Sequence, residues 1–195
     1  MSGRWYTFKD CRGRNRIDLT NRTILKDRDS KPLIEDLNRI PGFEHLSRKS
    51  RVETEMVKSS EVIFVDGVPV AFKREGQFVP VLTNTVALEK MPRVTVDMGA
   101  VPHVVGGADI MAPGIRKVEG TFREKELVVI VDEKHGKFLS VGRSLLGSET
   151  LAATKKGKVI VNIHYVGDVV WETIKAQASS ILEVDDLSRI WSGKV

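Results

Sequence analysis

The chain has 195 residues and a formal net charge of +5 at pH 7; 41% of its residues are hydrophobic and 29% are charged. No run approaches the roughly 18 uninterrupted apolar residues that a membrane-spanning helix needs, and a single cysteine excludes both an internal disulfide and a four-cysteine zinc site. Clustered cations attract polyanions, but a modest excess of positive charge is common among proteins of many functions, so charge alone names no partner.

Residues 1–20 alternate basic and polar side chains, and we expect an extended or weakly structured lead-in. They contain no apolar segment typical of a secretory signal. Cys11 lies in the basic run Lys9-Asp10-Cys11-Arg12 without a partnering base nearby, and we interpret it as an incidental or packing residue. A reducing, cytoplasmic location fits these features.

A helix is predicted next. Ser30 is expected to cap it, and Pro32 would lie in the first turn, where its missing N–H costs little. Apolar residues at helical spacing would form its buried face, namely Leu33, Ile34, Leu37 and Ile40. Pro41-Gly42 would end the helix, and residues 47–51 form a basic connector.

The clearest local pattern in the first half is a hairpin. Residues 62–65 and 68–72 are apolar and flank Asp66-Gly67, a dipeptide that accepts the positive φ angles of a type I′ turn. A third strand over residues 78–82 follows a turn at Glu75-Gly76. The sequence therefore predicts an α+β first half, with a helix and a small antiparallel meander, and a domain boundary at Met91-Pro92.

The second half predicts a mainly-β pseudo-barrel with short helices. A strand over residues 93–97 would lead to a helix that Asp97 caps and that ends at Gly106-Gly107. A strand fragment over 108–111, a hairpin from 127–131 and 138–141, and a short helix capped by Ser148 would follow. Strands over 159–163 and 169–171 would complete a small, partly closed barrel. Residues 175–195 have some helical character and are left without a structure.

Two segments have features beyond the spacing of their apolar residues. Glycines at 99, 106, 107 and 114 permit tight turns and let another backbone approach closely, so a sugar-phosphate backbone could lie against this region. Alternatively, the same glycines only form turns within a compact barrel. Lys155-Lys156-Gly157-Lys158 is suited to phosphate, but lysines at a helix C-terminus are favourable in any protein. His164 and Tyr165 either contact a base or end a strand in the core.

The order of these motifs resembles a PUA domain. The matching residues are Gly99-Ala100, the segment 107–115 with Pro113-Gly114, Val141-Gly142-Arg143-Ser144 and Lys156-Gly157-Lys158. The resemblance is closer to the malignant T-cell-amplified-sequence proteins and the related ligatin-type translation factors. Residues 163–171 resemble the end of their PUA domain, and residues 68–80 resemble their pre-PUA domain. This implies a pre-PUA domain at 1–91, a PUA domain at 92–171 and a tail at 172–195.

The resemblance also implies which residues contact RNA. Those expected along its backbone are Gly99, Ala100, His103, Gly106, Gly107, Ala108, Met111, Pro113 and Gly114. The expected phosphate contacts are Arg116, Lys117, Lys155, Lys156 and Lys158, and Arg143 is expected to reach a phosphate or a base. Asp109 is acidic, and we expect it to hold its turn by bonding its own backbone.

No catalytic constellation is visible. The four histidines are scattered, no phosphate-binding loop or dinucleotide fingerprint is present, and no cofactor or metal is expected. We therefore expect a non-catalytic protein that binds structured RNA, either tRNA or rRNA, at the small ribosomal subunit, with a partner resembling density-regulated protein and no membrane contact. Two alternatives stay open: a non-catalytic subunit of an RNA-modification complex, and a protein-interaction module that has lost RNA binding.

Overall fold

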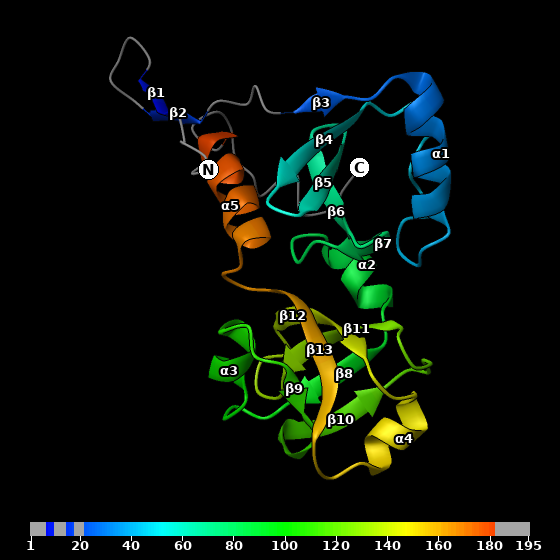
Figure 1. Ribbon diagram of the computed structural model, residues 1–195, viewed down its shortest axis with the longest axis vertical. Coiled ribbons are helices and arrows are strands. Elements are labelled where there is room, and N and C mark those ends of the chain that lie inside the picture. Colours follow the sequence, from blue (N-terminus) through cyan, green and yellow to red (C-terminus); the bar gives the residue numbers. More distant parts are fainter. Residues whose placement is uncertain (1–6, 10–14, 18–21, 182–195) are drawn as a thin grey trace.

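The computed structural model describes residues 7–9, 15–17 and 22–181. Cys11 and residues 182–195 of the tail lie outside the described residues. Two larger sheets, one above the other in Figure 1, make up most of the molecule, and a strand pair formed by β1 (Thr7–Lys9) and β2 (Asn15–Ile17) lies beside them. Within residues 7–9, 15–17 and 22–181, each helix is too short or too polar to span a lipid bilayer.

The first sheet is an antiparallel meander of five strands with a helix on its outer face. The strands lie in the order β3 (Thr23–Ile24), β4 (Val52–Val57), β5 (Ser60–Val65), β6 (Val68–Arg74) and β7 (Gln77–Pro80). Helix α1 (Asp27–Asn38) packs Ile34 and Leu37, both fully buried, against apolar side chains of this sheet. Asp66 and Gly67 have φ angles of 51° and 82°, which confirms the type of turn predicted for the β5–β6 hairpin.

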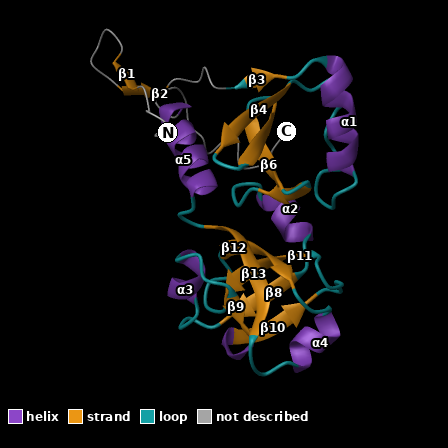
Figure 2. Cartoon of the chain, in the orientation of Figure 1, coloured by secondary structure: helices purple, strands orange, loops and turns teal. Residues whose placement is uncertain are grey.

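The second sheet is mixed and curled. Its strands lie in the order β10 (Ile115–Glu119), β8 (Arg93–Val96), β11 (Leu127–Asp132), β12 (Phe138–Ser144), β13 (Lys158–Tyr165) and β9 (Ile110–Met111). Only the β8–β11 pair among these is parallel. Helices α3 (Val101–Val105) and α4 (Ser148–Ala153) lie on either side of this sheet in Figure 2. An α+β first half and a mainly-β pseudo-barrel with short helices are thus confirmed.

The two sheets share one hydrophobic core. Phe64 and Phe72 of the first sheet lie in the same buried cluster as Val141 and Ile163 of the second. Helix α5 (Val169–Ile181) adds Val170 and Ile174 to this cluster, and Figure 1 shows the helix running back beside the first sheet. Burial of one continuous apolar surface therefore holds the two halves together.

Three predictions of helix starts and one of a strand are wrong or incomplete. Helix α1 begins at Asp27, and Ser30 lies inside it, because Asp27 and Asp29 already place negative charge in the first turn. Ser148 is the first residue of α4 rather than its cap, and its hydroxyl accepts a hydrogen bond from the N–H of Phe122. Asp97 accepts the N–H of Ala100 at 2.8 Å, one turn before α3 begins.

Residues 169–171 form the start of helix α5, not a strand. The Asp168 carboxylate accepts the N–H of Trp171 at 2.8 Å and so satisfies an unpaired donor of the first turn. This cap starts a helix although Val169, Val170 and Trp171 are residues that favour strands. The tail from residue 172 to residue 181 continues this helix.

Sequence reasoning did not assign several further elements. The spacing of apolar residues is too weak to predict strand β4, strand β10 or helix α2 (Thr85–Lys90) from the sequence. In β4, for example, the polar Glu53 is buried and the apolar Met56 is 65% exposed, so residue type does not follow burial along this strand. Sheet pairing on both sides, rather than local sequence, makes β4 a strand.

Candidate nucleic-acid interface

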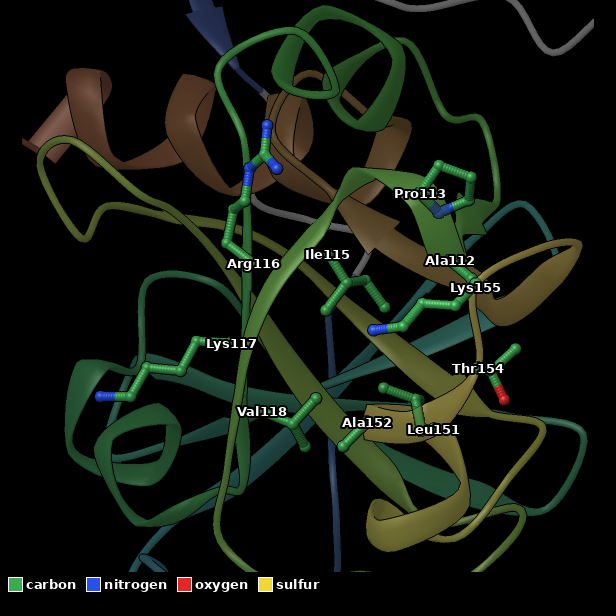
Figure 3. Close-up of a pocket in the computed structure, with 10 residues that line it drawn as sticks. All are labelled: Ala112, Pro113, Ile115, Arg116, Lys117, Val118, Leu151, Ala152, Thr154 and Lys155. Carbon is green, nitrogen blue, oxygen red and sulfur yellow. The ribbon is translucent and has the colours of Figure 1, made fainter.

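A pocket of about 290 Å³ opens between the edge strand β10 and helix α4. The 3₁₀ turn η2 (Ala112–Gly114) forms one end, and the segment after α4 forms another wall. Figure 3 shows its ten lining residues: Ala112, Pro113, Ile115, Arg116, Lys117, Val118, Leu151, Ala152, Thr154 and Lys155. Four of them, Pro113, Arg116, Lys117 and Lys155, were predicted to contact RNA.

Apolar side chains from two elements form part of the pocket's lining. Ile115 and Val118 project from β10, and Leu151, which is 1% exposed, and Ala152 project from α4. Leu151 also belongs to the hydrophobic core beneath the second sheet, so the base of the pocket is tied to packed structure. The apolar part of the lining is therefore fixed by packed structure, and charged side chains lie beside it.

Two of the three cations at the rim are engaged by carboxylates. Arg116 forms ion pairs with Asp97 at 3.1 Å and Glu133 at 3.7 Å. The ammonium of Lys117 lies 2.7 Å from Glu119, and this contact lowers the pKa of the Glu119 carboxyl. Figure 3 shows Lys117 directed away from the other lining side chains. These two residues are therefore less available to a phosphate than sequence reasoning expected.

Lys155 and Lys156 are different. Both are exposed, and within the described ranges neither has a carboxylate within ion-pair distance. In Figure 3 the side chain of Lys155 extends from the wall toward Ile115. Where no carboxylate lies beside an ammonium, no internal partner competes with an anion that arrives from solution. Of the predicted phosphate contacts, this adjacent pair is the best placed electrostatically.

The glycine-rich segment lies next to this pocket and is fixed to strand β13. The side-chain amide of Asn162 donates to the carbonyl oxygens of Val104 and Ala108 at 2.9 and 3.0 Å. Asp109 accepts the backbone N–H of Asn162 at 2.9 Å and forms an ion pair with Lys158 at 3.1 Å. The prediction that Asp109 bonds its own turn is corrected, because its partners lie on β13.

These contacts set the charge state of Asp109. The N–H of Asn162 and, secondarily, the ammonium of Lys158 lower the pKa of the Asp109 carboxyl below its ordinary value of 3.8. Asp109 is therefore ionised at neutral pH and holds Lys158. Lys158, predicted as a phosphate contact, thus has an internal partner.

Gly107 and Gly114 both stand at close approaches. Gly107 has a φ of +86°, and a Cβ built there would lie 2.7 Å from the ring of Tyr165. A Cβ on Gly114 would lie 3.1 Å from the Cβ of Ala100, so the turn before β10 packs directly on the start of α3. The glycines therefore serve internal packing at these two positions.

The remaining predicted contacts lie around helix α3, except for Arg143. His103 and Met111 are exposed beside the glycine-rich segment, and Met111 is 50% exposed. Gly99, Gly106 and Ala108 flank the same helix, α3. Arg143 stands apart from them: its guanidinium donates twice to the side-chain oxygen of Gln77 on β7, at 3.1 and 2.6 Å. Arg143 therefore connects β12 of the second sheet to β7 of the first.

His164 belongs to the core and does not reach a base. It is fully buried, accepts the N–H of Leu82 on Nε2 and meets the Asp168 carboxylate through Nδ1 at 2.7 Å. Tyr165 packs over Gly107. Burial in the core is thus the correct interpretation for His164. No group of three or more His, Cys, Asp or Glu side chains that could hold a metal occurs in the described part of the chain.

Leu151, Ala152 and Thr154 were not predicted as site residues. Their sequence signature is that of an ordinary short helix and its end. They meet β10 only because α4 packs on the edge of the second sheet, after a hairpin that separates the two elements along the chain. No local pattern could have placed them in the pocket.

Comparison with known protein families gives two matches. A profile described as the PUA domain matches residues 92–166, and a profile described as a domain of unknown function matches residues 21–86. Together the two matches cover most of both sheets.

Similar proteins occur in archaea and eukaryotes. An uncharacterised protein of Methanocaldococcus jannaschii is 35% identical over 80% of this chain and 98% of its own. Malignant T-cell-amplified sequence 1 of Rattus norvegicus is 31% identical over 69% of this chain and 80% of its own. Translation machinery-associated protein 20 of Saccharomyces cerevisiae is 29% identical over 85% and 95%.

Solved structures show the same fold. A hypothetical protein from Pyrococcus horikoshii has a TM-score of 0.67 at 33% identity, covering 78% of this chain and 99% of its own. A PUA domain protein from Aeropyrum pernix has a TM-score of 0.68 at 26% identity, covering 79% and 90%. Both match across the two sheets, and neither is limited to the second half.

Proposed function

The chain belongs to the family of PUA-domain proteins that includes the malignant T-cell-amplified sequence proteins, and we propose that it is a non-catalytic, RNA-binding protein that acts in translation. The association with translation rests on relatives named for the translation machinery. The RNA contact rests on the chain's own surface. We also propose that residues 1–91 form a pre-PUA region and residues 92–171 an RNA-binding region.

One observation supports the RNA contact above all. Lys155 and Lys156 are adjacent, exposed and without carboxylate partners in the described ranges, and Lys155 lines the pocket. Neighbouring cations on such a surface release counterions when they meet a phosphate backbone, and this release supplies most of the sequence-independent affinity for nucleic acid. Contacts to phosphate then fix the register in which bases are approached.

We infer that the RNA is tRNA or rRNA, that the protein works in the cytoplasm at the small ribosomal subunit, and that a partner similar to density-regulated protein contacts the first half. Relatives named for the translation machinery support a ribosomal setting. The absence of a catalytic cluster from the sequence motifs supports a binding role rather than a chemical one.

The experiment that tests RNA binding uses two matched charge reversals in the full chain. In the first, Lys155→Glu is combined with Lys156→Glu. In the second, Lys134→Glu is combined with Lys137→Glu, at the exposed tip of the β11–β12 hairpin. Both variants lose the same net charge. Affinity for tRNA and for rRNA fragments is then measured by filter binding over a range of salt concentrations.

We expect the Lys155/Lys156 variant to bind more weakly and to lose about 0.9 from the slope of log K against log salt for each phosphate contact removed. The hairpin variant should keep most of the slope. An unchanged slope in the first variant, or equal losses in both, would contradict the assignment of these lysines. A wild-type protein that binds neither RNA at low salt would favour a protein-interaction module.

Sedimentation distinguishes the sites of action. Under the proposal, the protein co-migrates with small ribosomal subunits in a sucrose gradient of cell extract, and the Lys155/Lys156 variant does so less. Co-purification with an RNA-modifying enzyme, and not with small subunits, would instead support a role in RNA modification.

A further inference from the structure

The glycine turn after α3, at Gly106-Gly107, holds its shape through its own backbone. The N–H of Gly107 donates to the carbonyl oxygen of Val104 at 3.0 Å. The N–H of Ala108 donates to the carbonyl oxygen of His103 at 2.9 Å. Together with the φ of +86° at Gly107, these two bonds form the Schellman motif, which ends many helices. The shape of the turn is therefore determined locally, but none of these bonds places the turn relative to the second sheet.

Asn162 attaches this turn to strand β13. Its side-chain amide donates to the carbonyl oxygens of Val104 and Ala108 at 2.9 and 3.0 Å, one before and one after the glycine turn in the chain. Its backbone N–H donates to the Asp109 carboxylate at 2.9 Å. One residue of β13 thus contacts the end of α3, the residue after the turn and the acidic residue that follows. Helix α3 and β13 also contact each other directly (Figure 1).

Strand β13 also begins with the basic segment. Lys158 is its first residue, and the lysines at 155–156 precede it. The N–H of Ala112, which follows β9, donates to the carbonyl oxygen of Gly157 at 2.9 Å. The segment from the glycine turn to Ala112 is therefore held at two points, at Asn162 and at Gly157. These two attachments set the distance between the glycine turn and the lysines.

The side chain of Asn162 contributes little to the stability of the fold. Its Oδ1 atom is buried and has no hydrogen-bond partner among the described residues, and an unpaired buried acceptor costs at least as much as a typical hydrogen bond contributes. The carbonyl oxygen of Val104 already accepts the N–H of Gly107. Ala108 is exposed, so water can replace the amide there. A buried polar side chain with this balance is better explained by the geometry that it imposes than by the stability that it adds.

We propose that Asn162 is a positioning residue of the RNA-binding surface, which holds the glycine turn at the distance from Lys155 and Lys156 at which both meet one RNA backbone. The proposal rests on the proposed RNA-binding function, and Asn162 acts through the turn rather than by a contact of its own with RNA. Binding that must first order a loose segment loses the free energy of that ordering, and a segment already held in place avoids the loss. Asn162 therefore contributes more to RNA affinity than to the stability of the fold.

Asn162→Leu tests this role in the full chain. Leucine has nearly the shape of asparagine, but it removes both donors together with the unpaired acceptor. We expect the midpoint of thermal unfolding to stay near that of the wild-type protein. The control is Arg22→Ala, which removes contacts of the first sheet and should lower stability without changing the glycine turn. Asn162→Ala removes the same donors without adding apolar groups, and it serves if the leucine variant is unstable.

RNA affinity is measured by filter binding of tRNA and rRNA fragments over a range of salt concentrations. Asn162→Leu should bind about tenfold more weakly at every salt concentration, because the turn must be ordered on binding. The slope of log K against log salt should stay unchanged, because the lysines still contact phosphate. Arg22→Ala should bind as tightly as wild type although it unfolds at a lower temperature. A residue with a purely structural role would not lower affinity while stability and slope stay the same.

The outcomes separate this inference from the proposed function. Full affinity in Asn162→Leu, or an equal loss of affinity in Arg22→Ala, would overturn the positioning role and leave RNA binding intact. A smaller salt slope in Asn162→Leu would overturn the role through the turn, since phosphate contacts would then depend on Asn162. If both Asn162 variants are unfolded at room temperature, the amide is required for the fold and the inference is wrong. Failure of the wild-type protein to bind either RNA at low salt would overturn the proposed function itself.

Discussion

Nε2 of His164, on the last strand of the second sheet, accepts a hydrogen bond of 3.1 Å from the backbone N–H of Leu82, which follows the first sheet. Because this nitrogen accepts, the ring proton lies on Nδ1 and points to the Asp168 carboxylate at 2.7 Å. Burial would raise the pKa of Asp168, but the hydrogen bond from His164 and those from the backbone of Trp171 and Tyr165 lower it overall. One buried histidine thus connects the two sheets and the helix that follows.

Replacing this histidine should weaken the join between the sheets. His164→Phe keeps a ring of similar shape but leaves the Leu82 N–H and part of the Asp168 carboxylate without a partner in a dry site. We expect a loss of about 1–3 kcal/mol in the free energy of unfolding. Urea denaturation measures it. His135→Phe, at an exposed hairpin tip, is the control and should change stability little; a full-stability His164→Phe protein would show that the Leu82 contact is dispensable.

Gly107 allows backbone strain and steric clash to be separated. Gly107→Ala introduces a Cβ at a φ of +86° and 2.7 Å from the Tyr165 ring, whereas Gly76→Ala introduces one at a φ of +78° with no atom within 4 Å. Both variants should lose roughly 1 kcal/mol to strain, and Gly107→Ala should lose more. Thermal unfolding compares them, and equal losses would indicate that Tyr165 moves aside freely. Gly107→Val should damage the fold or RNA binding further, since its β-branch is larger.

Arg22 attaches the C-terminal helix to the first sheet. Its guanidinium stacks 3.6 Å above the Phe64 ring, lies 3.5 Å from Glu53 and donates to the side-chain oxygen of Gln177 on α5 at 2.5 Å. Arg22→Ala removes these contacts together with an ion pair to Glu55 at 3.8 Å, and we expect a loss of about 1–3 kcal/mol. The loss is limited because Glu53 retains its pairing with Arg51.

The control for this prediction is Arg39→Ala, which removes an exposed pair with Asp36 and should cost no more than about 0.5 kcal/mol. Chemical denaturation of the two variants gives the comparison. Similar small losses in both would mean that the contacts of Arg22 form without stabilising the fold.

The Asp109 carboxylate should produce a pH dependence with a definite sign. Its pKa in the folded protein is below 3.8, so its charge stabilises the fold above that value, and this contribution disappears as pH falls through the folded pKa. Asp109→Asn lacks the titrating group. The stability difference between wild type and variant should be constant from pH 7 to about pH 5 and should shrink below about pH 4. Urea unfolding at several pH values measures it, and a difference that stays constant down to pH 2.5 would contradict the role of the charge.

Several local features followed from the sequence because short-range geometry decides them. The dipeptide at residues 66–67 forms its turn through the φ angles that those residue types tolerate, and α3 ends at Gly106, as predicted. The order of the second-half motifs likewise indicated the fold of that half, which the profile match over residues 92–166 confirms. By contrast, Val169 and Val170 predicted a strand, and a single capping carboxylate at Asp168 made the segment helical.

Residue types, their spacing and the order of the motifs indicated the family, the class of each half and a set of cations suited to phosphate. Folding set the contacts of each cation: Arg143 donates to Gln77 and Lys158 pairs with Asp109, while the side chain of Lys155 extends toward Ile115. The physical reason is that turns and caps depend on neighbours within a few residues, whereas ion pairing, burial and the shape of a pocket depend on side chains that only chain folding brings together.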